Sequence, residues 1–234
     1  MDSKKPLGHS AYGSIPHLPC SRLGPKDHSV NAGQARICLE QARDKYDRII
    51  CQEKLDGSCV AVALLNDQVL ALGRAGYLAA DSPYVHIRMF ADWVAKNESR
   101  FRRVLRNGER VVGEWLALSH STIYYLEYDE PFAAFDIMFG QRRLLFDDFE
   151  KRVDSTFSRP FMLHDGGPIG VDAAMRLHAE KHWPCDEIEG VMYRVERCGD
   201  VIFLAKFVRL DKIDGKYLPE ISGQPPIWNW KPAE

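Results

Sequence analysis

The fold is decided by the stretch Arg48-Ile49-Ile50-Cys51-Gln52-Glu53-Lys54-Leu55-Asp56-Gly57-Ser58-Cys59-Val60-Ala61-Val62-Ala63-Leu64-Leu65. Two apolar runs flank a short polar loop, which is typical of two strands joined by a turn. Lys54 ends the first run, and Asp56 follows two positions later. Residues two apart project from the same face of an extended chain. The pattern therefore predicts a lysine and a carboxylate on one face at the end of a strand.

Further elements are expected on both sides of this stretch. Additional strands are predicted at residues 68–74, 110–117 and 132–139. Apolar residues that recur at intervals of three and four predict helices at residues 83–105, 144–153 and 171–183. A hairpin is predicted from residues 187–197 and 201–209, with Gly199-Asp200 as its two-residue turn. Mostly antiparallel strands with a few helices indicate the α+β class.

The chain is expected to contain one catalytic-sized domain. Residues 1–46 predict an irregular N-terminal arm rich in Gly, Pro, Ser and His, residues 47–210 the domain itself, and residues 211–234 a short C-terminal tail. No internal repeat is found. Because single cores stop growing only beyond roughly 250 residues, 234 residues suffice for one large core.

Composition narrows the class of protein. Lysine and arginine number 31 and aspartate and glutamate 33, so the net charge is 31 − 33 = −2, and 45% of residues are hydrophobic. These values are typical of a globular chain and exclude a polybasic coat. No apolar run approaches the roughly 20 residues that span a bilayer, and the six cysteines form no C-x-x-C pair. We therefore expect no signal peptide, no membrane partner and a reducing, cytoplasmic location.

Lys54 is the candidate nucleophile. An amine attacks only when uncharged, so the pKa of Lys54 would have to fall from about 10.4 toward neutrality, and about three units cost roughly 4 kcal/mol. Neighbouring cations or a metal ion are expected to supply this shift. Carboxylates crowding the amine would count against the hypothesis. Alternatively, Lys54 is a solvated strand-end lysine before an ordinary turn.

Five further motifs follow Glu53–Ser58 in order. They are Gly73-Arg74-Ala75-Gly76, Gly113-Glu114-Trp115, Phe135-Asp136-Ile137, Glu189-Gly190-Val191 and Ala205-Lys206-Phe207-Val208-Arg209. Across residues 48–209 the sequence thereby resembles the covalent nucleotidyltransferases, which include ATP-dependent DNA ligases, RNA ligases and mRNA capping enzymes. The Glu-Lys-x-Asp-Gly-Ser form and the Lys-Phe-Val-Arg ending are most similar to RNA ligases. The resemblance implies a nucleotidyltransferase (ATP-grasp-like ligase) core of mainly antiparallel sheets with flanking helices.

The resemblance also implies the catalytic residues. Lys54 would attack the α-phosphate of ATP and carry AMP, Glu189 would hold Mg²⁺ or Mn²⁺, and Lys206 would neutralise the α-phosphate. AMP would then pass to an RNA 5′-phosphate, and a 3′-hydroxyl would displace it to seal the strand. Such charge neutralisation is what phosphoryl transfer needs most.

The remaining implied residues bind the nucleotide. Arg74 and Glu114 would contact the ribose and a phosphate, Phe135 would stack on the adenine, and the backbone around Glu53 would read the base edge. Asp56 and Gly57 complete the nucleotide site, with Gly57 allowing backbone to approach the ligand. Four of the implied residues also have a purely structural interpretation. Phe135 would be a core residue, Glu114 and Glu189 would be solvated strand-edge acids, and Lys206 would be an edge-strand lysine.

The last two motifs permit one geometric prediction. With Gly199-Asp200 as the turn, Lys206 lies opposite Tyr193, so Glu189 and Lys206 face one side of the sheet. One departure from the family pattern is visible. Many members carry Lys-x-Lys in the last motif, whereas Val208 stands at the second position here. Arg209 would face the other side unless a bulge intervenes, so its role stays open.

Two weaker signals remain. Five arginines could contact RNA phosphates or the leaving pyrophosphate, or could form an exposed helix face: Arg100, Arg102, Arg103, Arg106 and Arg110. His178, His182 and Cys185 could form part of a zinc site, although a solvated helix face is the preferred interpretation.

Alternative functions also remain open. They are a capping-type guanylyltransferase, a DNA ligase-like enzyme and a non-catalytic nucleotide- or RNA-binding module. Only 234 − 206 = 28 residues follow Lys206, so no OB-fold domain is expected. We expect a minimal RNA ligase core, with the arm or a partner protein performing the role of the C-terminal domain.

Overall fold

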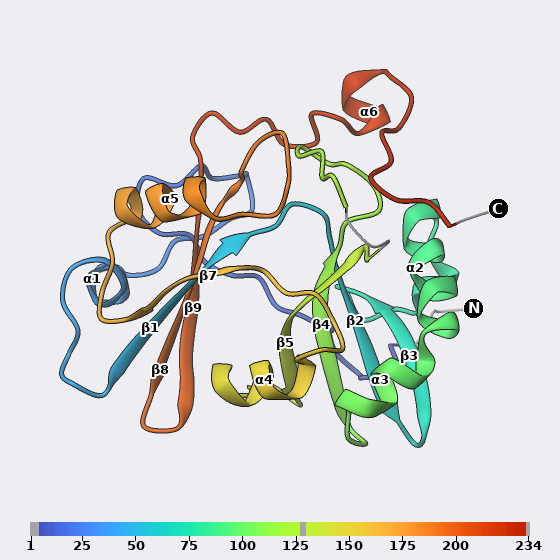
Figure 1. Ribbon diagram of the computed structural model, residues 1–234, viewed down its shortest axis with the longest axis horizontal. Helices are drawn as coiled ribbons and strands as arrows, with labels where there is room; N and C mark the ends of the chain where they lie inside the picture. Colours follow the sequence, from blue (N-terminus) through green and yellow to red (C-terminus); the bar gives the residue numbers. More distant parts are fainter. Residues whose placement is uncertain (1–4, 127–129, 233–234) are drawn as a thin grey trace.

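Two antiparallel sheets form the framework of the protein (Figure 1). The computed structural model describes residues 5–126 and 130–232. The strands are β1 (Asp47–Lys54), β2 (Ser58–Leu65), β3 (Gln68–Gly73), β4 (Glu109–Trp115), β5 (Phe132–Phe139), β6 (Arg142–Arg143), β7 (Met162–Gly166), β8 (Gly190–Arg197) and β9 (Asp200–Val208). The strand orders are β7-β1-β8-β9 in the first sheet and β3-β2-β4-β5-β6 in the second.

The helices lie around these sheets on several sides in the view of Figure 1. They are α1 (Ala32–Leu39), α2 (Val85–Lys96), α3 (Glu98–Val104), α4 (Phe146–Val153), α5 (Val171–Glu180) and α6 (Pro219–Ser222), with a 3₁₀ turn at Ala79–Asp81. The expected α+β class with mainly antiparallel sheets is confirmed. Within residues 5–126 and 130–232, no helix is both long and apolar enough to cross a bilayer.

The chain crosses from one sheet to the other between Lys54 and Ser58. β1 belongs to the first sheet and β2 to the second, so the loop containing Asp56 and Gly57 lies where the two sheets meet. The most distinctive motif of the sequence is therefore held by both sheets.

The two faces of β2 pack in two different apolar clusters. Val60 and Val62 are buried in a core with Phe90 of α2, whereas Ala61 and Ala63 lie in a separate cluster on the other face. Because alternate strand residues point to opposite faces, the large side chains anchor the helix and the small ones allow close approach on the side of the first sheet.

The amphipathic segment predicted as one helix at residues 83–105 is two helices. α2 ends at Lys96 and α3 begins at Glu98. The side-chain amide of Asn97 donates to the carbonyl oxygen of Trp93 at 2.9 Å. Asparagine side chains compete with the backbone in this way, so the apolar periodicity continues while the helix bends.

The final hairpin differs from its prediction by its register. Cys198 and Gly199 are the turn residues, both at positive φ (50° and 87°), and Arg197 pairs with Asp200. A register shift follows between Val195 and Glu196. A turn with φ above zero at both central positions matches strand twist best, which explains why the turn lies one residue earlier than expected.

As a result, Lys206 pairs with Met192 and not with the predicted Tyr193. Met192 in turn pairs with Gln52, and Lys54 lies two residues further along β1. Lys54 and Lys206 therefore share one face of the first sheet. Glu189 precedes β8 and has the opposite parity to Met192, the partner of Lys206, so it reaches Lys54 around the end of the strand. The prediction that Glu189 and Lys206 face one side of the sheet is therefore wrong.

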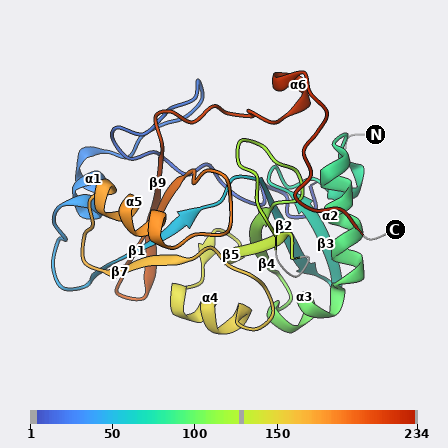
Figure 2. The same ribbon diagram turned by 45° about the horizontal axis from the view of Figure 1, so that its top comes forward.

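The N-terminal arm lies along the free edge of β9. The amide of Lys206 donates to the carbonyl of Pro16 at 2.9 Å, and the amide of Leu18 donates to the carbonyl of Lys206 at 2.7 Å. Val208 donates its amide to Ser21 Oγ at 2.9 Å. The arm thus satisfies backbone groups that an edge strand would expose. Figure 2 shows it passing along this side of the molecule.

Gly190 supports a test of the β8–β9 packing. A Cβ atom there would lie 2.0 Å from the carbonyl oxygen of Phe207, whereas one at Gly73 would meet nothing within 4 Å. Gly190→Ala should lower the free energy of unfolding by about 1–3 kcal/mol, since overpacked backbone must shift. Gly73→Ala should change it by less than about 0.5 kcal/mol. Urea denaturation measures both, and equal effects would contradict the assigned contact.

Candidate active site

A cavity of about 310 Å³ lies between the two sheets. Its size and mixed lining suit a small-molecule site. Residues from both sheets and from the arm line it: Tyr12, Gly13, Ile15, Gln52, Glu53, Lys54, Leu55, Gly57, Cys59, Arg74, Glu114, Phe135, Pro160, Met192, Tyr193, Arg194, Leu204 and Lys206. Seven of the predicted site residues are therefore brought together here, from Glu53 to Lys206 along the chain.

Lys54 faces this cavity but is held by a carboxylate. Its Nζ donates to Glu189 Oε2 at 2.5 Å. Burial lowers the pKa of Lys54, but the carboxylates of Glu189, Glu114 and Asp56 outweigh burial and raise it above its ordinary value. The expectation that cations lower this pKa is therefore wrong, and the carboxylates that would count against Lys54 as a nucleophile do surround its amine. Lys54 is an ammonium in this state, because acidic groups surround it.

Asp56 and Glu189 adjoin the cavity and share a second lysine. Lys212 Nζ lies 2.9 Å from Asp56 Oδ1 and also contacts Glu189 Oε1. Asp56 Oδ2 accepts the amide proton of Ser121 at 2.7 Å. The pKa of Asp56 is lowered, because Lys212 and Lys54 outweigh the effect of burial. Lys54 and Asp56 are thereby linked through ion pairs with Glu189 and Lys212.

Glu114 is the second carboxyl group inside the cavity. Its Oε1 accepts the amide proton of Gly57 at 3.1 Å. Burial raises the pKa of Glu114 to about 8, and nearby Glu189 and Asp56 add to the effect. A Cβ at Gly57 would lie 2.6 Å from the carbonyl oxygen of Trp115, so only glycine lets this loop lie against β4.

Two further cations stand on the cavity wall. Burial and the charge of Lys54 lower the pKa of Lys206, and Asp27 of the arm lies 3.8 Å from its Nζ. Arg74 is largely exposed and donates to the carbonyl of Gly13 at 3.1 Å. The arm therefore orients both cations. The amino-acid composition of the arm gave no indication of this role.

Phe135 lines the cavity and is only half-buried. Tyr12 of the arm packs edge-on against it, with ring centroids 5.3 Å apart. Tyr12 is itself fixed, since its hydroxyl donates to Asp136 Oδ2 at 3.3 Å. An aromatic face that is oriented and half-open provides a stacking surface for a planar ligand.

Glu53 is one of the cavity-lining residues, and its carboxylate supports neighbouring loops. Oε1 accepts the amide proton of Phe161 at 2.8 Å, and Oε2 accepts that of Trp183 at 3.0 Å. The amide of Glu53 donates to the carbonyl of Phe161 at 3.0 Å. Its role in reading a base stays a prediction.

Arg209 lies outside the cavity. It follows the end of β9 and donates to Glu187 Oε2 at 3.1 Å. Within the described residues it contributes instead to a small cleft of about 80 Å³ beside Glu189. Arg209 therefore does not supply at the cavity the second cation that the last motif lacks because Val208 stands in its place.

The arginine cluster does not form one surface. Arg110 is 1% exposed and donates to the carbonyl of Ala11, whereas Arg100 and Arg102 pair with Glu130 and Glu98. An RNA-binding face made by all five arginines is excluded, because Arg110 is buried.

The possible zinc site also lacks its ligand set. His178 is buried, with its Nε2 3.5 Å from Glu53, so it is not on a solvated face. In the described part of the chain, no three His, Cys, Asp or Glu side chains converge as a metal site.

A divalent cation at Glu189 would therefore depend on the ligand for its remaining oxygens. Carboxylate oxygens are the donors that Mg²⁺ and Mn²⁺ prefer, and Mg²⁺ is commonly bound through one or two carboxylates plus substrate phosphates. Glu189 beside the cavity fits this arrangement, whereas a cage made of protein ligands alone does not.

Sequence reasoning missed two contributors to the site. Tyr12 lies in an arm without periodicity, and Lys212 lies in the segment after β9. No spacing rule links these residues to Lys54. Their signal is tertiary, since each reaches the site through a contact between distant segments.

Two antiparallel sheets with a motif lysine facing the cavity between them define a nucleotidyltransferase-type core. The family profile described as RNA ligase matches residues 47–208. The chain belongs to the RNA ligase family, which confirms the resemblance drawn from the motifs.

Solved structures show the same fold. An archaeal ATP-dependent RNA ligase (form 2) has a TM-score of 0.51 and 16% identity, over 85% of this chain and 48% of that chain. A mutant RNA ligase of Naegleria gruberi with ATP and Mn has a TM-score of 0.51 and 17% identity, over 86% and 61%. A putative ATP-dependent DNA ligase from Aquifex aeolicus has 0.50 and 13%, over 85% and 49%.

At these identities the likeness concerns the fold alone. This chain covers 48% to 61% of the length of these three neighbours. No curated protein matches the sequence.

Glu114 gives the unliganded chain a testable pH dependence. Its pKa is about 8 in the folded chain and near 4.5 when unperturbed. The folded state therefore binds this proton more tightly, so its contribution to stability is present below pH 4.5 and is lost as pH rises toward 8. Glu114→Gln, which keeps the acceptor for Gly57, should flatten this loss in denaturation curves recorded from pH 5 to 8 without metal or nucleotide. Parallel profiles for both proteins would disprove the assignment.

Proposed function

We propose that this protein is an ATP-dependent RNA ligase, which joins RNA 5′-phosphate and 3′-hydroxyl ends through a lysyl-AMP intermediate. The observation that carries the proposal is the position of Lys54 at the cavity, on the same sheet face as Lys206 and opposite Glu114 and Phe135 of the second sheet. Membership in the RNA ligase family supports RNA as the substrate.

The proposed reaction begins with the amine of Lys54. Its Nζ forms a bond to the α-phosphorus of ATP, and the bond from that phosphorus to pyrophosphate breaks. Lys206 offers the α-phosphate a positive charge on the same face of the sheet, and Arg74 offers a second from the cavity rim. Such fixed charges stabilise the charge that develops on phosphate oxygens.

The ion pair of Lys54 with Glu189 must open before this step. While Glu189 holds Lys54 at 2.5 Å, the amine keeps its proton and cannot attack. Mg²⁺ or Mn²⁺ bound at Glu189 would neutralise that carboxylate and polarise the phosphates. Glu189, the carboxylate that raises the pKa of Lys54 most, is thus the group expected to meet the metal.

In the proposed second half, AMP moves from Lys54 to the 5′-phosphate of RNA. The 3′-hydroxyl then attacks that phosphate and AMP leaves. Substrate positioning by the N-terminal arm or by a partner protein is part of the proposal. The arm supports this, since it already touches β9 and the cavity.

Covalent labelling tests the first step. Incubation with Mg²⁺ and ATP labelled at the α-phosphate should leave label on the protein, and label at the γ-phosphate should leave none. Peptide mass spectrometry should place one AMP on Lys54. Lys54→Ala should abolish the label, whereas Lys96→Ala on the exposed side of α2 should retain it. Nucleotide binding without label at any metal concentration would favour a non-catalytic binding module.

Substrate choice tests the second step. A nick with ribose at the junction should be sealed, and the same nick made wholly of DNA should be sealed at least about tenfold more slowly, because 2′-hydroxyls distinguish RNA from DNA. GTP should not replace ATP. Equal sealing of both nicks would point to a DNA ligase, and labelling from GTP to a capping-type enzyme.

A further inference from the structure

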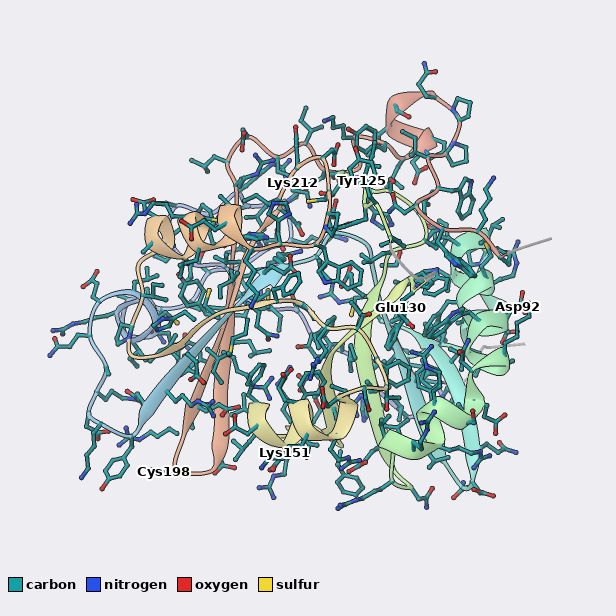
Figure 3. The ribbon with its side chains drawn as sticks, in the orientation of Figure 1. Asp92, Tyr125, Glu130, Lys151, Cys198 and Lys212 are labelled. Carbon is teal, nitrogen blue, oxygen red and sulfur yellow. The ribbon has the colours of Figure 1, made fainter. Side chains whose placement is uncertain are left out.

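Lys212 is a cation inside the site that no motif of the family explains. It lies in the segment after β9, and its side chain is 8% exposed. Figure 3 places Lys212 between the two sheets, at the end of the β8–β9 hairpin opposite the turn marked by Cys198. Its ammonium group bridges Asp56 Oδ1 and Glu189 Oε1.

This bridge occupies oxygens that a metal ion would need. Glu189 is 4% exposed, and its two oxygens contact Lys54 and Lys212 respectively. One carboxylate oxygen of Asp56 accepts a hydrogen bond from the amide of Ser121, and the other accepts one from Lys212. A divalent cation at the carboxylate of Glu189 would therefore compete with both ammonium groups for its oxygens.

The two ammonium groups are not equivalent. Lys54 is attached to β1, which is paired along its length with β8, and so it has little freedom to withdraw. Lys212 lies outside the strands in a segment of turns. That segment is tied to the body by backbone contacts further along, where Gly215 donates to Ser121 Oγ and Tyr217 to the carbonyl of His120. Lys212 can leave without breaking either sheet.

We propose that Lys212 is a resident counter-cation of Glu189 and Asp56, which a divalent metal ion displaces when it binds. The inference rests on the proposed function in one respect, namely that Glu189 is the metal-binding carboxylate. In the unliganded chain Lys212 prevents two buried carboxylates from facing each other uncompensated, which would be costly. On metal binding the same residue becomes a competitor for these two carboxylates.

Direct metal binding tests this proposal. The free Mn²⁺ signal in electron paramagnetic resonance reports the affinity of the full chain without nucleotide. Lys212→Met should bind Mn²⁺ about tenfold more tightly or better, since it removes a positive charge at contact distance from the metal position. Lys212→Arg, which keeps that charge, should stay near the wild type. Lys216→Met is the matched control, because Lys216 lies in the same segment but pairs with Glu187 instead.

A thermal-shift measurement keeps the test valid if Lys212→Met is less stable. Mn²⁺ should raise its melting temperature more than it raises that of the wild type or of Lys216→Met, because ligand binding stabilises the folded state according to affinity. Unchanged or weaker Mn²⁺ binding by Lys212→Met would overturn the proposal.

The result is independent of whether Lys54 carries AMP. Tighter Mn²⁺ binding without any protein label would support the role of Lys212 while contradicting the ligase reaction. Labelling of the wild type together with unchanged Mn²⁺ affinity in Lys212→Met would do the reverse.

Discussion

The charge balance around Lys54 is the constraint on which the site depends. Three carboxylates surround the amine, and burial in the cavity acts against its charge. The structure resolves this conflict with ion pairs: Lys54 with Glu189, and Glu189 and Asp56 with Lys212. A buried carboxylate without a partner would be costly, so each charge requires the next. Lys54 is held in this network as a charged group, because the surrounding carboxyl groups raise its pKa.

The seam between the sheets makes this arrangement possible. The chain passes from β1 to β2 through the loop that contains Asp56 and Gly57. Lys54 ends the strand on one side, and Glu114 approaches from β4 on the other. Two rigid sheets thereby determine the width of the cavity, while small residues such as Gly57 and Ala61 leave the chain room to pass. Precise placement of this kind is what nucleotide transfer requires.

The N-terminal arm and the segment after β9 both contribute residues to the site. The arm pairs with β9 beside Lys206 and orients Tyr12 against Phe135. The segment after β9, in the C-terminal part of the chain, places Lys212 against Glu189. Both ends therefore belong to the site, although neither contains a motif of the family.

The sequence by itself determined the class, the order of the motifs and most of the lysine, arginine and acidic residues that line the cavity. These properties follow from local periodicity and from residues whose chemistry is specific at fixed spacing, as in Glu53–Ser58. Tertiary structure alone decided the register that pairs Lys206 with Met192, the break at Asn97 and the protonation state of Lys54. Register depends on one turn and one bulge, and a pKa depends on every charge nearby. Lys212 and Tyr12 show the same limit, because contacts between segments far apart in the chain leave no local pattern.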